Sequence, residues 1–150
     1  EEVMTRLKEK HGIRLEWVNA PGFWQASSSK DYNDFVSRSL IYFNPTFGSP
    51  MPRSRSEAML LGCCIITTPQ HGGADYIKDG VNGFIVGHNE VDKAVEIIAT
   101  LINNGYEQAI WMGKNARETA IKEFSIERYH NDWVNFLNDE VGIDMSQYGV

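Results

Sequence analysis

The chain has 150 residues and a mass of 17.0 kDa, with 14 basic and 20 acidic side chains and a formal charge of −6. A compact chain of this mass exposes roughly 7,700 Å² and can bury one core, so we expect a single soluble domain. The negative charge opposes binding to nucleic acid backbones. Apolar runs such as Ala58–Leu61 are far shorter than the ~20 residues that cross a bilayer. We therefore expect neither a nucleic acid partner nor a membrane span.

The two cysteines, Cys63 and Cys64, are adjacent in an apolar run that is typical of a buried strand. Neighbouring strand residues point to opposite faces, so we expect two separate buried thiols and no disulfide. The histidines show no metal-ligand spacing with each other or with these thiols, so no metal site is predicted. Cysteine usage of this kind favours a cytoplasmic protein. The start at Glu1, without a methionine or a signal peptide, is typical of a piece of a longer protein.

Helices and strands are predicted to alternate along the first half of the chain. The apolar spacing predicts a helix over 1–10 that ends at Gly12, and a strand over 13–18. Ser28 begins an N-cap signal for a second helix over 32–38. Further along we expect a strand over 40–44, a proline-rich loop over 45–54, a short helix over 57–61 closed by Gly62, and a strand over 63–68.

The second half is predicted to be mainly helical. One helical turn over 74–77 and a brief strand over 84–86 come first, and Ser125 is expected to cap the last helix. The tail after about residue 138 is expected to be loose. Three apolar stripes at helical spacing are predicted to pack in the core: Val91, Val95, Ile98, Leu101 and Ile102; Ile110, Ala116, Thr119, Ala120 and Ile121; and Tyr129, Trp133, Phe136 and Leu137.

Four short strands that alternate with helices predict an α/β domain with a doubly wound parallel sheet. Such sheets bind ligands at the carboxyl ends of their strands. The densest polar segment, 44–59, lies at one of these ends and joins a strand to a helix start. Free backbone N–H groups at a helix start attract anions, and Arg53 and Arg55 add donors suited to phosphate oxygens. The segment therefore favours a phosphate-bearing ligand.

A structural interpretation of the same segment is equally concrete. Ser54-Arg55-Ser56-Glu57 matches the capping box S-x-x-E, in which Glu57 only caps its own helix. Arginines in a loop are also commonly solvated surface charges. The spacing alone leaves both interpretations open.

Several fragments, in a fixed order, resemble the C-terminal domain of group 1 (family 4) glycosyltransferases. The resemblance spans about residues 13–137 and is carried by Pro45-Thr46, 54–59, Gly62, 65–68, Gly72-Gly73, 77–86, 111–117 and 124–129. It implies a Rossmann-like domain that forms the C-terminal half of a two-domain GT-B glycosyltransferase. This half would bind a nucleotide-activated sugar, such as a UDP- or GDP-hexose. The N-terminal domain would hold a glycan or other acceptor, with transfer occurring with retention and without a bound metal.

The resemblance also implies roles for single residues of the donor site. Glu57 stands where the family's glutamate bonds the ribose hydroxyls, and Ser49 stands where the family commonly has another glutamate. The family's basic residues that hold the diphosphate would lie before Glu1, so Arg53 or Arg55 is expected to substitute, with Arg53 favoured. Backbone amides that meet the diphosphate or donor sugar are expected around Met51, Pro52, Arg53 and Ser54.

Two further loops and the last helix complete the expectations. His71, Gly72 and Gly73 would place small residues and a helix start beside the same cleft, although a plain turn with an exposed histidine is the alternative. Asn19 and Ala20 stand at the family's base-binding loop. The resemblance also gives the aromatic stripe of the last helix an alternative role, in which the helix crosses to the other domain.

Two other functions stay open at this stage. A nucleotide- or carbohydrate-binding module without transfer chemistry is one, because Ser49 replaces an expected carboxylate. A sugar-nucleotide epimerase or hydrolase built on the same two-domain plan is the other.

Overall fold

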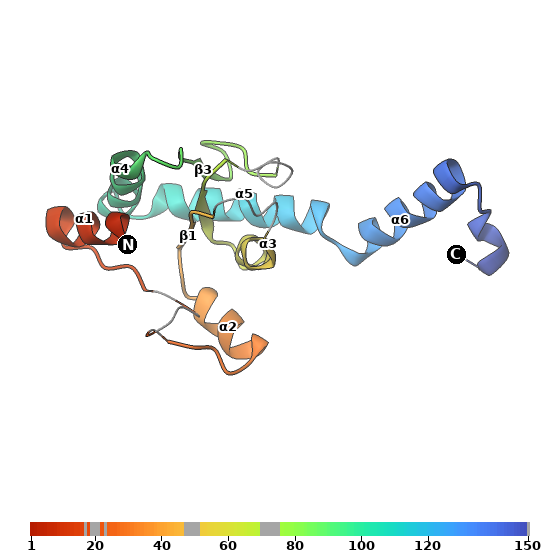
Figure 1. Ribbon diagram of the computed structural model, residues 1–150, viewed down its shortest axis with the longest axis horizontal. Coiled ribbons are helices and arrows are strands. Elements are labelled where there is room, and N and C mark those ends of the chain that lie inside the picture. Colours follow the sequence, from red (N-terminus) through yellow and green to blue (C-terminus); the bar gives the residue numbers. More distant parts are fainter. Residues whose placement is uncertain (17, 19–21, 23, 47–51, 70–75, 150) are drawn as a thin grey trace.

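The structure is a computed structural model that describes residues 1–16, 18, 22, 24–46, 52–69 and 76–149. Helices and strands alternate in the first part, and long helices make up the last third (Figure 1). In chain order the elements are α1 (Glu2–His11), α2 (Ser29–Val36), β1 (Ile41–Asn44), α3 (Arg53–Leu60), β2 (Cys64–Thr67), β3 (Gly83–Ile85), α4 (Val91–Asn103), α5 (Glu107–Glu123), α6 (Ile126–Phe136), a π-helix (Leu137–Val141) and a 3₁₀ helix (Met145–Tyr148).

The three strands form one parallel sheet in the order β1-β2-β3. Ile41 of β1 lies opposite Cys64, and Ile65 of β2 lies opposite Gly83. Every residue of the central strand β2 is buried, as expected for a parallel sheet that is covered on both faces. The predicted α/β class and the parallel sheet are therefore confirmed.

The two faces of the sheet carry two separate hydrophobic clusters. Cys64 and Ile66 pack with α1 and α4, whereas Cys63 and Ile65 pack with α3 and the later part of α5. The adjacent cysteines thus point to opposite faces, as predicted, and both are free thiols. Burial raises the pKa of the Cys63 thiol to about 11 and that of Cys64 to about 12, so both are protonated at neutral pH.

The described residues of the strand predicted over 13–18, which are 13–16 and Val18, do not form a strand. Residues 13–16 have no regular secondary structure, and Val18 makes one isolated bridge with Trp24. Ile13 and Leu15 instead pack against the cluster between α1 and α4. A strand needs a hydrogen-bonded neighbour, and β1 pairs only with β2 among the described residues, so the alternation of apolar side chains was satisfied by packing alone.

Helix α5 runs close to the sheet because glycines allow it. A Cβ built on Gly113 lies 2.0 Å from the carbonyl oxygen of Gly62, which itself adopts the left-handed conformation at φ +83° after α3. Gly62 therefore follows the end of α3, as predicted, and also lies in close contact with Gly113 of α5. Of the stripe predicted on this helix, Ala116 and Ala120 are buried, as expected, whereas Ile110 and Ile121 are exposed.

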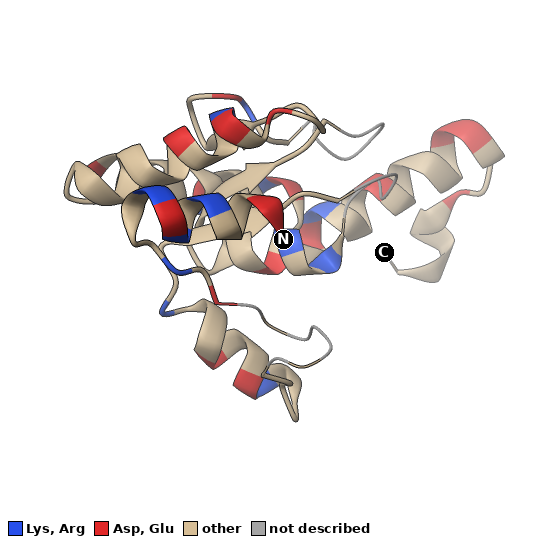
Figure 2. Cartoon of the chain, turned by 60° about the vertical axis from the view of Figure 1, so that its left-hand side comes forward, with Lys and Arg blue, Asp and Glu red and all other residues tan. Residues whose placement is uncertain are grey.

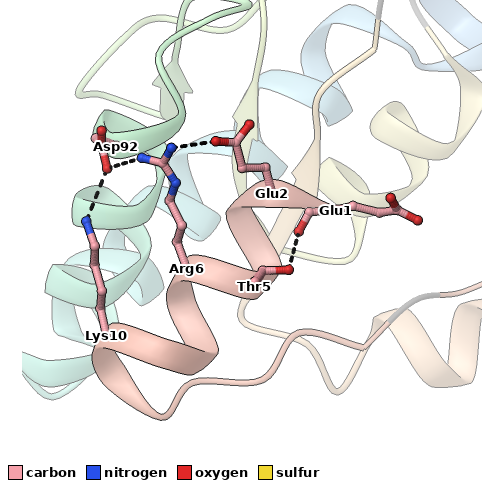
Figure 3. Close-up of polar contacts among 6 residues, drawn as sticks. All are labelled: Glu1, Glu2, Thr5, Arg6, Lys10 and Asp92. Carbon is pink, nitrogen blue, oxygen red and sulfur yellow. Dashed lines mark hydrogen bonds and ion pairs between the residues drawn. The ribbon is translucent and has the colours of Figure 1, made fainter.

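Helix α1 is tied to the start of α4 by ion pairs (Figure 3). The Arg6 guanidinium donates to Asp92 at 2.6 Å and to Glu2, and Lys10 Nζ lies 3.3 Å from the same Asp92 oxygen. The hydrogen bond from Arg6 is the main cause that lowers the pKa of the Asp92 carboxyl. Figure 2 shows acidic and basic residues interspersed along α1 rather than gathered by sign.

Helix α6 extends away from the rest of the molecule (Figure 1). At the junction with α5, Arg128 pairs with Glu123 at the end of α5 and with Asp132 one turn further along α6. Tyr129, Trp133 and Phe136 are 66%, 46% and 47% exposed, so the prediction that this stripe packs in the core is wrong for the chain as it stands. The total accessible surface of 9527 Å² exceeds the roughly 7,700 Å² of a compact chain for the same reason.

Candidate functional site

The carboxyl ends of β1 and β2 are joined by threonine side chains. Thr67 Oγ1 donates to the Asn44 carbonyl oxygen at 3.0 Å, and Thr68 Oγ1 donates to the Thr46 carbonyl oxygen at 2.6 Å. Both threonines are buried. The chain that leaves β1 is thus held beside the end of β2, at the edge where doubly wound sheets bind ligands.

Helix α3 begins at this edge, four residues earlier than predicted. It starts at Arg53, after the last proline of the loop, with Pro52 in extended conformation as the N-cap residue. No side chain caps the helix, and Ser54 lies inside its first turn. The predicted capping box is therefore wrong, because the S-x-x-E pattern fits only if the helix begins after Ser54.

The charge pattern at the start of α3 also differs from that of the other helices. Each other α-helix of the described chain has an acidic residue in its first turn, as the macrodipole favours. The first turn of α3 has none and carries Arg53 instead. An uncapped helix start with a basic residue is poor for stability and suited to an anionic ligand.

Glu57 lies on the first part of α3 and pairs with Arg53. Arg53 Nε donates to Glu57 Oε1 at 2.8 Å across one helical turn. The Arg53 side chain is 85% exposed and that of Glu57 is 27% exposed. The carboxylate is thus partly accessible beside the sheet edge, and an exposed pair of this kind contributes little to stability.

Arg55, in contrast, is fully buried. One guanidinium nitrogen, Nη2, lies 3.4 Å from Asn44 Oδ1 and 3.3 Å from Thr46 Oγ1. Burial lowers the pKa of the Arg55 side chain, which nevertheless remains protonated at neutral pH. The interpretation of Arg55 as a solvated surface charge is therefore wrong.

Tyr32 of α2 covers the same part of α3. Its hydroxyl lies 3.4 Å from that of Tyr42, and burial is the main cause that raises the pKa of Tyr32. A side-chain hydrogen bond from Ser54 acts in the opposite direction, and Glu57 adds a smaller electrostatic effect. Ser54 and Glu57 are three residues apart and share one helix face, which Tyr32 approaches.

The remaining predicted site residues lie outside the described residues: Asn19, Ala20, Ser49, Met51, His71, Gly72 and Gly73. The structure brings Pro52, Arg53, Ser54, Arg55 and Glu57 together on α3 at the end of β1. Sequence reasoning located this strand end but missed the side-chain network of Asn44, Thr46, Thr67 and Thr68. The signal was present, because Asn44 and Thr67 directly follow the apolar parts of two strands, and Thr46 and Thr68 come one or two residues later.

The sequence model of the family "Glycosyl transferases group 1" matches residues 14–119, which is most of the chain. The chain belongs to this family. Poly(ribitol-phosphate) alpha-N-acetylglucosaminyltransferase of Staphylococcus aureus (strain COL) is 30% identical over 69 residues, which are 46% of this group 1 chain and 14% of that protein.

Solved structures share the fold of this group 1 domain. A crystal structure of TarM superposes with a TM-score of 0.76 at 18% identity and covers 92% of this chain and 31% of that one. HepE of Anabaena with UDP and glucose gives 0.68 at 22% identity, with 77% and 31% covered. The C-terminal domain of LpcC from Francisella tularensis gives 0.61 at 17% identity, with 67% and 51% covered.

These proteins are GT-B glycosyltransferases, and the similarity confirms the Rossmann-like fold of a GT-B C-terminal half. The chain spans about a third or less of the length of TarM, HepE and the Staphylococcus aureus enzyme. Within the described ranges, no three His, Cys, Asp or Glu side chains are grouped to hold a metal ion. No helix in that part of the chain has the length and apolarity to cross a membrane.

Proposed function

We propose that the chain is the donor-binding domain of a retaining glycosyltransferase that uses a nucleotide-activated sugar, such as a UDP- or GDP-hexose. The acceptor, a glycan or another hydroxyl compound, would be held by an N-terminal Rossmann-like domain of the same protein. The observation that carries the proposal is membership of the group 1 glycosyl transferases together with an uncapped, basic helix start at the sheet edge.

Ligands of the related structures support a nucleotide-sugar donor. HepE is described in complex with UDP-glucose, and a G117R mutant of S. aureus TarM in complex with UDP, alpha-GlcNAc-glycerol and fondaparinux. A diphosphate carries its charge where the free N–H groups of a helix start and the Arg53 side chain can neutralise it. The ribose presents hydroxyl donors that the partly exposed Glu57 carboxylate can accept.

The proposed roles follow the sequence of ligand groups from base to sugar. Asn19 and Ala20 would border the base, and Glu57 the ribose. The amides of Pro52-Arg53-Ser54 and the neighbouring Met51 would meet the diphosphate; proline itself contributes no N–H donor. Ser49 and the segment His71-Gly72-Gly73 would border the donor sugar.

Transfer exchanges one bond at the anomeric carbon for another. The bond to the diphosphate oxygen breaks, a bond to the acceptor oxygen forms, and the proton of the acceptor hydroxyl passes to the departing diphosphate. Negative charge grows on the departing nucleoside diphosphate, where the fixed dipoles of α3 and the Arg53 cation would stabilise it. We propose that no metal is needed for this step in the enzyme.

The exposed aromatic face of α6 supports the proposal that the protein has a second domain. Tyr129, Trp133 and Phe136 form a continuous edge-to-face ladder, with ring centroids 6.2 Å and 5.6 Å apart. An apolar face of this size is usually covered by protein. We propose that α6 packs against the N-terminal domain and fixes its position over the donor. The free, buried Cys63 and Cys64 thiols suit a reducing compartment, and we place the enzyme in the cytoplasm.

The test is an assay of the full-length protein with labelled nucleotide sugars and glycan acceptors. Acceptor-dependent formation of a glycoside with the donor's anomeric configuration is expected. Free sugar released without an acceptor would identify a hydrolase, and a change of the sugar while it stays on the nucleotide would identify an epimerase. Tight nucleotide binding without any turnover would identify a binding module.

A further inference from the structure

Arg55 connects the two described ends of the loop between β1 and α3. Its backbone belongs to the first turn of α3, whereas its guanidinium reaches back to the side chains of Asn44 and Thr46 at the end of β1. The backbone of the same two residues accepts hydrogen bonds from Thr67 and Thr68 of the β2 end. Arg55 therefore attaches the start of α3 to an edge that is itself cross-linked.

We propose that Arg55 is a positioning residue, which fixes the start of α3 and hence Glu57 against the sheet edge, and that it does not contact the donor phosphates. The inference rests on the proposed function, because Glu57 and the α3 amides are taken as nucleotide contacts. It gives different roles to the two arginines in the first turn of α3: Arg53 faces the ligand, and Arg55 faces the sheet edge.

Burial and bonding distinguish the two arginines. A phosphate ligand needs guanidinium donors that are open to the cleft, and Arg53 is 85% exposed. Arg55 is fully buried and spends an N–H-bearing nitrogen on two oxygens of the β1 end. A planar guanidinium can reach both oxygens from one helix position, whereas a lysine ammonium is a point charge on a flexible stem. The planar guanidinium of an arginine thus suits a link between α3 and the end of β1, in addition to carrying a positive charge.

The experiment measures binding of UDP, or GDP if the protein prefers it, to the full-length protein and its variants. Thr46→Val removes one oxygen of the bridge and leaves both arginines in place. Arg55→Lys keeps the charge and removes the planar group. We expect each variant to bind the nucleotide about fivefold more weakly, the cost of one hydrogen bond. The double variant should bind no more weakly than the weaker single variant, because both changes break one bridge.

Arg117→Lys is the matched control, because Arg117 Nη1 bonds the Leu60 carbonyl oxygen at 2.5 Å, at the opposite end of α3. It should lower the unfolding temperature and leave nucleotide affinity unchanged. Wild-type affinity of Thr46→Val would overturn the positioning role and, if Arg55→Lys alone is weaker, make Arg55 a ligand. Equal weakening by Arg117→Lys would reduce Arg55 to a general stabiliser. An unaltered protein that binds neither nucleotide would overturn the proposed function and this role together.

Discussion

Helices α3 and α6 both begin at serine-containing segments, yet their first turns differ in hydrogen bonding and in charge. Ser125 accepts a hydrogen bond from the Arg128 amide at 3.1 Å, and Glu127 adds an acid in the first turn of α6. Helix α3 has no side-chain cap, no acid and an exposed Arg53. Helix α2 follows the pattern of α6, with Ser28 as the cap and Asp31 as the acid.

The charge of the first turn, rather than the missing cap, separates α3 from the other described α-helices, because α1, α4 and α5 also lack a side-chain cap and yet begin with an acid. The basic start of α3 agrees with the proposed anion site. A side-chain cap occupies the N–H groups that an anion would otherwise bind. Helix α6 begins directly after α5 with Ser125 as its cap, and Arg128 pairs there with Glu123. The N-cap residue of α3, Pro52, makes no side-chain cap, and the Arg55 N–H of the first turn donates to the Pro52 carbonyl oxygen at 2.9 Å. Local rules that are broken at such a position are expected at functional sites.

The largest expected effect concerns the ligand side of the comparison. Glu57→Gln should weaken nucleotide binding to the full-length protein by roughly 1.5–3 kcal/mol, because a charged acceptor for the ribose hydroxyls is lost. Stability should change by less than about 0.5 kcal/mol, since the exposed pair with Arg53 is worth little. Isothermal titration and a thermal melt measure both quantities. An unchanged affinity would remove Glu57 from the site.

A side-chain cap introduced at α3, like the one that Ser125 gives α6, should remove the difference between the two helix starts. Pro52→Asp places a carboxylate at the N-cap, where it can accept from the N–H groups of the first turn and repel the diphosphate. Affinity for the nucleoside diphosphate should fall by about 1–2 kcal/mol, the larger helix-terminus effects, while affinity for the nucleoside should change little. Ser125→Asp, which keeps a cap on α6, is the control and should change neither affinity. Equal losses for both ligands would contradict an anion site.

Ser125 and Ser54 are expected to contribute differently to the free energy of unfolding, because only Ser125 caps a helix. Ser125→Ala should lower the free energy of unfolding by about 1 kcal/mol, because the Arg128 amide loses its partner. Ser54→Ala should cost no more than about 0.5 kcal/mol, since Ser54 lies inside α3 and caps nothing. Urea denaturation of the two variants under identical conditions gives the difference. A larger loss for Ser54→Ala would restore the capping box.

The smallest expected effect is a pH dependence at α1. The pKa of Asp92 is lowered in the folded chain, first by the hydrogen bond from Arg6, so its contribution is present above the unfolded pKa of about 3.9. It is lost as pH falls through the lower folded value. Asp92→Asn should therefore flatten the decline of stability below about pH 4. Denaturation midpoints between pH 3 and 6 measure this, and an unchanged slope would show that the carboxylate is not linked to folding.

Much of the fold could be predicted from local patterns. Gly12 ends α1 in the left-handed conformation, Ser28 and Ser125 cap their helices, and Cys63 and Cys64 point to opposite faces. Each of these outcomes depends on a few neighbouring residues and on the fixed periods of helix and strand. The prediction of a strand over 13–18 is not met by the described residues there, because a strand must pair with a distant segment of the chain, and no local pattern shows such pairing.

The candidate site was predictable in place and not in detail. The fragments quoted for the family led to the β1 end and to Glu57, because their order survives along the chain. Spacing could not tell that α3 begins at Arg53, before Ser54, and for this reason the serine interpreted as a cap lies inside the helix. It also could not tell Arg53 from Arg55, two residues apart, of which one is exposed and one is buried.

The α/β class, the parallel sheet and the strand ends proposed as the ligand site follow from hydrophobic period and chain order, and could therefore be predicted from the sequence. Which charges are buried and which apolar faces stay exposed depends on contacts between distant segments, and became visible only in the folded chain. Arg55 is buried because the β1 end and α3 meet around it, and the Trp133 face of α6 is exposed because nothing in this chain packs over it among the described residues. Periodicity identifies an apolar face, and packing alone determines what covers it.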